Sequence, residues 1–366
     1  MGAVTTERTL FTGGGKPGHM ESTGTVEYEP VSVKAVLAEM KDTAELLIDL
    51  SYSAVLLGSN DVAEEVIELE SQMDVLQLQA RMSLLMAARS PEDAEALAPV
   101  LGVVGATEKI SDATGDVAKV VIEEIGLPDA LRTALPEAIE TVARALVADD
   151  SPLAGHTLES LNLETETGVR VIAIRRGGDW LLNPDRDDYI RAGDVLLLRG
   201  VEENIERVYP DVTGAEYVAP DPVEPGIEDL ERAVDSIVLM KNMSELGVDI
   251  AYGSVLYDSD GLAEEVAELE AEVDALESRF EAWVLRAASR VDDPVSLRGL
   301  MHIAEATEVI SDAALEIAEG VLRGMGTHPV VAEAVFESDE VVVRLDVTPG
   351  SQLAGTTLGE QMVRTE

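Results

Sequence analysis

Cysteine is absent from the 366-residue chain. A disulfide scaffold, a thiolate metal site and a cysteine nucleophile are therefore excluded. Long apolar runs are also missing, since none reaches the ~18 residues of a membrane-spanning helix. The start of the chain has no charged head followed by an apolar stretch, so no secretory signal is predicted. These absences favour a cytoplasmic protein without direct membrane insertion.

Lysine is scarce, with six among 26 basic residues, against 72 acidic residues and a formal net charge of −46. Aromatic residues make up only 3 %, but the apolar fraction of 46 % is enough for real cores. An acidic, lysine-poor surface of this kind is typical of proteins from halophilic archaea, where concentrated salt screens the self-repulsion. The same charge opposes binding to a phosphate backbone, so nucleic acid is excluded as an expected partner.

The sequence repeats itself at an offset of 200 residues without a gap from about residue 45 to 160. The segment Ala-Glu-Glu-Val at 63–66 returns at 263–266, and ATEKISDA at 106–113 returns as ATEVISDA at 306–313. SPLAGHTL at 151–158 returns as SQLAGTTL at 351–358. The chain therefore carries two copies of one unit.

The first part of each copy has the apolar spacing of helices. In the first copy, Ser59 or Asn60 is placed to cap a second helix. Ser90 and Pro91 open a third helix, which we expect to run to about 126–128. Three long helices with short joints predict an up-down-up bundle.

The second part changes to the period of strands, rich in β-branched residues. Its Gly177-Gly178 pair fits a hairpin turn. We expect a small α+β domain with strands at 142–147, 169–174, 180–182 and 194–198, and helices at 157–162 and 201–209.

The second copy of this part begins near Val341 and stops at Glu366 with one strand and the short helix. Such a piece does not close a sheet alone. Truncation of the chain is the favoured explanation; completion by another chain and a loose tail are the alternatives. The predicted division is a leader, tag or upstream extension (1–30), a bundle (31–135), a sheet domain (136–210), a linker (211–226), a second bundle (227–327) and a truncated sheet domain (328–366).

The helical parts resemble the PhoU family of three-helix-bundle regulators associated with phosphate uptake. The likeness rests on Glu-x-x-x-Asp motifs, which that family uses to hold metal ions. The sheet parts resemble the TrkA C-terminal (RCK-C) domain of potassium-conductance regulators, through Ser151–Gly155, Val169–Arg176 and Arg191–Asp194. The resemblance implies a mainly helical α+β fold in which PhoU-like bundles alternate with TrkA-C-like domains. No G-x-G-x-x-G motif follows a strand, so an NAD site is not implied.

The resemblance implies metal ligands at Glu45, Asp49, Glu108, Asp112, Glu245, Asp249, Glu308 and Asp312. Residues four apart share one helix face, and the pairs 45/49 and 108/112 could lie side by side if the first and third helices run parallel. Adjacent carboxylates repel unless a cation neutralises them, and oxygen ligands suit a divalent metal or iron. The alternative is a solvated acidic face, because about one residue in five is acidic.

Arginine gathers in the first sheet domain, where residues 168–200 hold six of the chain's 20 arginines. Arginine suits bidentate contacts with phosphate or carboxylate. We predict an anionic-ligand site, with a nucleotide as a possible ligand, at Arg170, Arg175, Arg176 and Arg191. The alternative is that these side chains pair with local aspartates.

No catalytic serine, nucleophile elbow or phosphate loop is visible, so we expect no enzyme. The expected function is a homodimeric regulator that senses a small ligand or ion and acts on a membrane potassium or other cation transporter. The alternative is a PhoU-type regulator of phosphate uptake that partners a phosphate transporter and binds metal on its surface. A metal-dependent enzyme is a third class.

Overall fold

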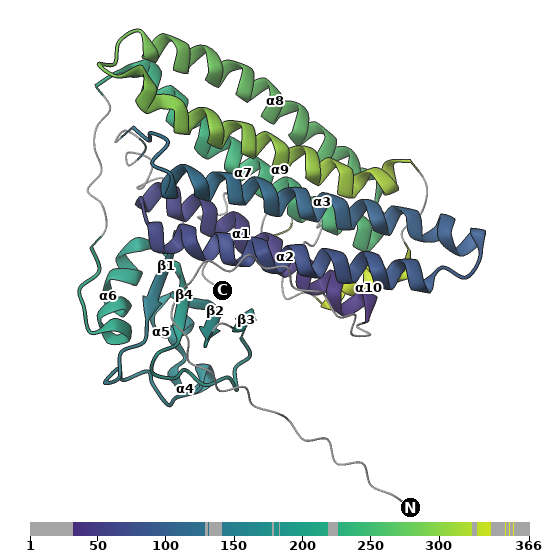
Figure 1. The fold of residues 1–366 in the computed structure, drawn as a ribbon, viewed down its shortest axis with the longest axis horizontal. Helices are drawn as coiled ribbons and strands as arrows, with labels where there is room; N and C mark the ends of the chain where they lie inside the picture. Colours follow the sequence, from purple (N-terminus) through teal and green to yellow (C-terminus); the bar gives the residue numbers. More distant parts are fainter. Residues whose placement is uncertain are drawn as a thin grey trace, which may run out of the picture.

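A computed structural model describes residues 32–128, 131, 141–177, 179–182, 184–218, 226–323 and 328–337, together with residues 348, 351 and 354. Its elements are α1 (Val33–Leu57), α2 (Asn60–Ala87), α3 (Pro91–Ile122), β1 (Thr141–Leu146), α4 (Leu158–Leu161), α5 (Leu163–Thr167), β2 (Arg170–Arg176), β3 (Asp179–Leu182), β4 (Val195–Gly200), α6 (Glu202–Thr213), α7 (Glu228–Tyr257), α8 (Asp260–Ala288), the 3-10 turn η2 (Pro294–Leu297), α9 (Arg298–Leu322) and α10 (Pro329–Glu337). The predicted fold class, helical bundles with a small α+β domain, is confirmed (Figure 1). Within the described residues no helix has the length and apolarity to cross a membrane.

Local capping explains where the helices of the first bundle begin. Ser59 caps α2 by accepting a hydrogen bond from the Val62 amide, and Ser90 caps α3 by accepting one from Asp93. Ser59 is one of the two caps that the sequence offered for α2, and Ser90 stands where α3 was expected to open. Helix α3 ends at Ile122, a few residues before the expected boundary, and Glu124 then takes a left-handed φ of 50°. The residue supplies the reversal that usually falls to glycine at a helix end.

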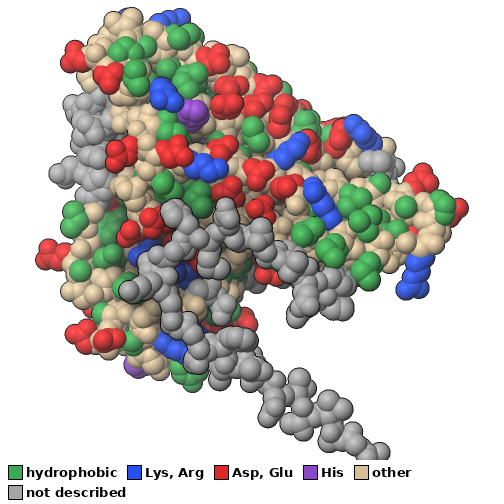
Figure 2. All heavy atoms as spheres, in the orientation of Figure 1, with side chains coloured by type: hydrophobic (Ala, Val, Ile, Leu, Met, Phe, Trp, Pro, Cys, Tyr) green, Lys and Arg blue, Asp and Glu red, His purple; other side chains and the backbone are tan. Residues whose placement is uncertain are grey.

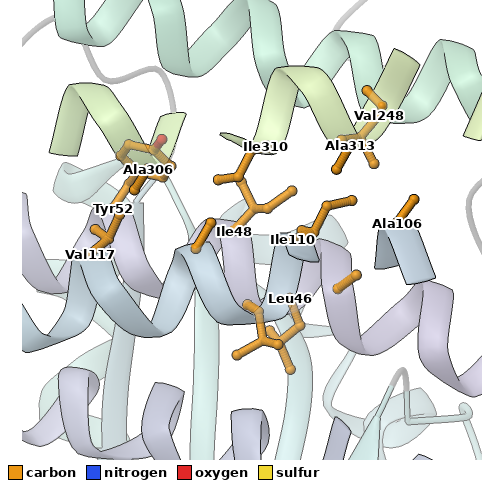
Figure 3. Packing of buried hydrophobic residues seen from close by; sticks show 14 of the residues in the cluster. Leu46, Ile48, Tyr52, Ala106, Ile110, Val117, Val248, Ala306, Ile310 and Ala313 are labelled. Atoms are coloured by element: carbon orange, nitrogen blue, oxygen red, sulfur yellow. The ribbon is translucent and has the colours of Figure 1, made fainter. Parts of the chain in front are cut away.

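The two bundles share one continuous apolar core. Helices α3 and α9 pack against each other at its centre, and Ile110 and Ile310 lie at this contact (Figure 3). The Gly299 amide donates to the Gly126 carbonyl at 2.8 Å, and a Cβ on Gly299 would lie 2.4 Å from that oxygen. Only glycine allows this close approach between the end of the first bundle and the start of α9.

The sheet is fully antiparallel in the order β1-β4-β2-β3. Side chains alternate between its two faces. Val142, Ile172 and Leu197 join the core of the bundles, whereas Ala143, Ile174 and Leu196 form a second core with α6. The sheet therefore lies between α6 on one face and helices α1 and α2 on the other (Figure 1).

Several boundaries differ from the expected ones. The short helix near 157–162 is two helices, α4 and α5, and α6 continues to Thr213, into the predicted linker. Helix α10 packs against α1 and α7, and its Val331 and Ala334 join the core of the bundles. The strand expected from Val341 lies outside the described residues.

Candidate functional site

The acidic pairs of α1 and α7 face each other across the contact between the two copies. Asp49 is hydrogen-bonded to Glu245, and Glu45 interacts electrostatically with Asp249. Lys41 forms an ion pair with Glu45 on the same helix. The sequence indicated that 45/49 could lie beside 108/112, whereas the charged neighbours of Glu45 and Asp49 come from α1, α7 and β4. The structure thus joins equivalent motifs of the two copies.

Burial dominates the protonation of this cluster. It raises the pKa of Glu45 to about 8, with Lys41 opposing the rise and Asp249 adding to it. Burial likewise raises the pKa of Asp49 to about 7, against the opposing charge of Arg199. Near neutral pH, protonation of Glu45 and partial protonation of Asp49 therefore limit the repulsion between these carboxyls and those of α7.

Hydroxyl pairs flank the cluster in a reciprocal arrangement. The Tyr52 hydroxyl lies 2.6 Å from Thr307 Oγ1, and the Tyr252 hydroxyl lies 2.8 Å from Thr107 Oγ1. Each pair joins α1 or α7 of one copy to the third helix of the other. The copies are thus related as the subunits of a two-fold dimer, in which one patch contacts itself.

Three arginines of the sheet domain hold it against the first bundle. Arg199 pairs with Asp49 at 3.0 Å. Glu65 on α2 accepts from Arg144 at 2.8 Å and from Arg175 at 2.6 Å. Arg199 also lines a small pocket of about 40 Å³ between α1 and the sheet, together with Asp42, Glu45, Leu46, Asp49, Arg170, Ile172 and Leu182.

A larger pocket of about 480 Å³ opens on the sheet domain itself, between α4, α5 and β2. Its polar lining comprises the arginines Arg170 and Arg186, the glutamates Glu159 and Glu164, and the uncharged Asn162 and Thr165. Arg170 lines both pockets, and it stands opposite Arg199 in the β2–β4 register. This one arginine therefore links the open pocket to the acidic cluster.

The other predicted ligand arginines are placed differently. Arg175 reaches Glu65, and Arg176 makes a bidentate pair with Asp194 at 2.9 and 2.7 Å. The backbone amide of Arg191 donates to the same Asp194. Arg176 thus pairs with a local aspartate, as the alternative interpretation expected, whereas Arg175 pairs with a glutamate of the first bundle. Arg170 is the predicted residue that lines the large pocket.

The remaining acidic pairs lie in grooves between the second and third helix of each bundle. Glu108 pairs with Arg81 at 3.0 Å, and Asp112 lies near Asp74 and Asp116. In the second copy, burial and the neighbouring carboxylates of Asp312 and Glu277 raise the pKa of Glu308 to about 7. Figure 2 shows acidic side chains gathered over α8 and α9.

The geometry of these grooves decides whether they can hold a metal ion. In the part of the chain that the structure describes, no three histidine, aspartate or glutamate side chains are grouped so that they could hold a metal ion. The carboxylates of the groove in the second copy repel one another. Part of the rise in the pKa of Glu308 comes from these acidic neighbours. Its residue types suit a hard divalent cation, while their arrangement is not a preformed cage.

The roles of Glu65, Arg144 and Arg199 were not predicted from the sequence. Glu65 looked like one acid among many on α2, yet its side chain is 3 % exposed. Retention of Arg144 as Arg344 and of Glu65 as Glu265 is a signal that could have found the first of these pairs.

Comparisons with known proteins find two domain families in this chain. The PhoU domain family matches residues 37–121 and 237–321, and the TrkA-C domain family matches residues 142–212. A curated relative, "Probable potassium channel protein 2" of Methanocaldococcus jannaschii, is 33 % identical over 61 residues, which is 17 % of this chain and 18 % of the relative. This match thus spans less than a fifth of the relative's length. The crystal structure of PhoU from Pseudomonas aeruginosa is 14 % identical with a TM-score of 0.44, over 80 % of this chain and 96 % of that one.

Proposed function

From the premise that this chain contains two PhoU domains with a TrkA-C domain between them, we propose that it regulates cation transport by sensing a small anionic ligand. Both are regulatory domain families. The potassium-channel name of the archaeal relative supports a potassium or other cation transporter as the partner.

The open pocket with Arg170 carries the proposal. A volume of about 480 Å³ is in the range of small-molecule sites, and two arginines with an amide and a hydroxyl suit phosphate groups. Glu159 and Glu164 in the same lining suit the hydroxyl and amino donors that a nucleotide carries beside its phosphates. A nucleotide is the ligand class that fits this chemistry. Neutralising Arg170 would change the field on Arg199, its cross-strand neighbour, which pairs with Asp49 on the first PhoU domain. The ligand state would thus be transmitted to the helical bundles.

Calorimetric titration in high KCl with ATP, ADP and cyclic dinucleotides tests this. We expect saturable binding by one of them that is weakened at least tenfold in Arg170→Gln and in Arg186→Gln. Arg191→Gln is the matched control, since its side chain is exposed and outside the pocket lining, and should bind as the parent does. Absence of binding by the whole panel, or equal loss in all three variants, would contradict the proposal.

A second candidate, a phosphate-uptake regulator with surface metal, is supported by the acidic grooves of the PhoU domains. The basic Arg81 of the first groove is replaced by Glu281 in the second, so a cation should prefer the second copy. Metal analysis should then show stoichiometric metal that is lost in Asp312→Asn and mostly retained in Asp112→Asn. Metal content that does not change in either variant would reject this candidate without affecting the first.

A further inference from the structure

Helix α2 carries apolar side chains on the face that points away from the bundle core. Val75 and Leu78 are 41 % and 40 % exposed, and Leu85 and Met86 are 71 % and 63 % exposed. Together with the partly buried Met82 they recur at spacings of three and four residues, so they share one face of the helix. These five residues are called the α2 stripe below.

The α2 stripe lies opposite the residues that hold the helix in its bundle. On the other side of α2, Met73, Ala80 and Leu84 are buried in the core. A surface helix normally carries polar residues opposite its core face. Figure 2 shows hydrophobic side chains gathered at the end of the first bundle where α2 meets α3. Packing within this bundle therefore does not account for the stripe.

The second copy shows that the bundle folds without such a stripe. The equivalent positions on α8 have the same burial, with four exposed residues and one partly buried residue. Apart from one leucine, the side chains there are small or charged: Ala275, Ser278, Ala282, Leu285 and Arg286. The extended apolar surface is thus specific to the first copy, and a surface of this kind is typical of an interaction site.

The charge of the segment is also unusual for this chain. Residues 75–91 contain Arg81 and Arg89 and no acidic residue, although the chain has 72 acidic residues among 366. The equivalent segment of the second copy contains Glu277 and Glu281. A second molecule with the same net charge of −46 would therefore meet no carboxylate from residues 75–91.

The apolar pattern of the α2 stripe is complementary to itself. Consider two α2 helices that pack antiparallel, with a two-fold axis at the level of Ala80. Leu78 then lies opposite Met82 of the second copy. In the same register, Val75 lies opposite Leu85 of the second copy. Each apolar residue thus meets an apolar one, as a two-fold dimer requires of a patch that contacts itself.

The charges at the two ends of the stripe match in the same register. Arg89 follows the stripe and lies opposite Ser71 of the second copy. Three residues to either side of Ser71 are Glu68 and Asp74, which lie within one helical turn of it. The arginine at one end therefore approaches carboxylates at the other, and the two-fold axis repeats this contact.

We propose that the α2 stripe is the surface on which two copies of this chain associate, with their α2 helices antiparallel. The stripe is about 17 Å long, so the contact is smaller than the ~1,200 Å² of stable complexes and the dimer should dissociate on dilution. Salt should strengthen it, because salt screens the net charge and leaves the apolar contact intact. The proposal does not depend on the ligand proposed above.

Sedimentation equilibrium of the full chain in high KCl tests the surface. Leu85→Glu should raise the dissociation constant of the dimer roughly tenfold or more, because the contact would have to desolvate a carboxylate. Leu285→Glu is the matched control, since Leu285 is also 71 % exposed and lies at the equivalent position of α8. Its dissociation constant should stay within about twofold of that of the parent.

Cysteine cross-linking tests the register and does not depend on the glutamate variants being folded. The chain has no native cysteine. Val75→Cys and Leu85→Cys proteins are treated with a short bis-maleimide, alone and as a mixture, and examined by denaturing gel. Antiparallel packing predicts a cross-linked dimer mainly in the mixture, whereas parallel packing predicts it mainly in each protein alone. Ser278→Cys is the control on α8 and should stay uncross-linked.

Two results would overturn the proposal. Equal dissociation constants for the parent, Leu85→Glu and Leu285→Glu, with no cross-link in the mixture, would assign the dimer contact to another surface. A parent that is monomeric at every concentration would exclude the dimer. Flotation of that monomer with phosphatidylglycerol vesicles, lost in Leu85→Glu, would then assign the stripe to a membrane surface.

Discussion

The two PhoU copies are alike at their mutual contact and unlike at their outer faces. Tyr52 and Tyr252 make equivalent hydroxyl contacts, with Thr307 and Thr107. The equivalent leucines on the outer faces of α1 and α7 differ sharply in exposure, since Leu46 is 7 % exposed and Leu246 is 48 % exposed. A repeated sequence therefore fixes the contact that both copies contribute, while burial of the outer face depends on which domain covers it.

The grooves between the second and third helices differ in charge for a simpler reason. Arg81 and Lys119 of the first copy stand at positions taken by Glu281 and Glu319 in the second. Glu108 consequently has an arginine partner, while repulsion from nearby carboxylates helps raise the pKa of Glu308 to about 7. The copies have thus diverged in electrostatics where packing allowed it.

The largest expected difference between the copies concerns Glu65. Glu65→Gln removes the shared partner of Arg144 and Arg175 and leaves two partly buried guanidinium groups with only the longer ion pairs to Asp61 and Glu68. We expect a loss of about 3 kcal/mol in unfolding free energy, since breaking a buried pair from one side is costly. Urea unfolding followed by circular dichroism measures it.

Glu265→Gln is the matched control for this prediction. Its side chain is exposed, so the unfolding midpoint should stay close to that of the parent. Equal effects of the two substitutions would mean that the ion pairs of the first copy do not stabilise the docked sheet domain.

A smaller difference is expected for the outer leucines. Leu46→Ala deletes a side chain packed at the seam with the sheet domain and should cost about 2 kcal/mol, near the low end for buried leucines. Leu246→Ala should cost far less in the same chain, because that side chain is about half exposed. The comparison is contradicted if thermal unfolding shows the same shift for both.

Local features of the fold were predictable from the sequence. The caps at Ser59 and Ser90 and the strands of the sheet domain follow from short-range patterns that the folded chain retains. Boundaries moved where the tertiary structure intervened, as when α6 extended into the predicted linker. The caps and strands were readable because their causes lie within a few residues.

The site was less predictable because its contacts join distant segments. Arg175 lies 110 residues from Glu65, and no local pattern indicates that this carboxylate is its partner. The reciprocal approach of the 45/49 and 245/249 pairs arises from the packing of α3 on α9. The repeat predicted that equivalent motifs exist in both copies. It did not predict that these motifs contact each other, because that contact depends on the two-fold arrangement of the copies.

The acidic cluster at the contact predicts a pH dependence. Because burial raises the pKa of Glu45 from 4.5 to about 8, the folded chain holds a proton that the unfolded chain has released between these values. This contribution is complete below pH 4.5 and is lost as the pH rises through about 8. The unfolding free energy should fall with a slope of at most about 1.4 kcal/mol per pH unit for this group.

Glu45→Gln tests this slope in chelator-treated protein. The variant should lose less stability than the parent between pH 5 and 8, by roughly 1 kcal/mol or more. Leu84→Ala, at a buried position of α2, serves as an uncharged control that lowers stability similarly at every pH. An unchanged slope in Glu45→Gln would show that Glu45 titrates in the folded chain as it does in the unfolded one.

The smallest expected effects test whether the copies are equal at their contact. Tyr52→Phe and Tyr252→Phe each remove one buried hydroxyl contact and should cost about 1 kcal/mol. The threonine partners keep their hydrogen bonds to Val103 O and Ile303 O, so neither hydroxyl is left without a partner. Equal shifts in the urea midpoint are expected from the reciprocal geometry. A clearly larger loss for one tyrosine would show that the docked sheet domain extends its asymmetry into the contact between the copies.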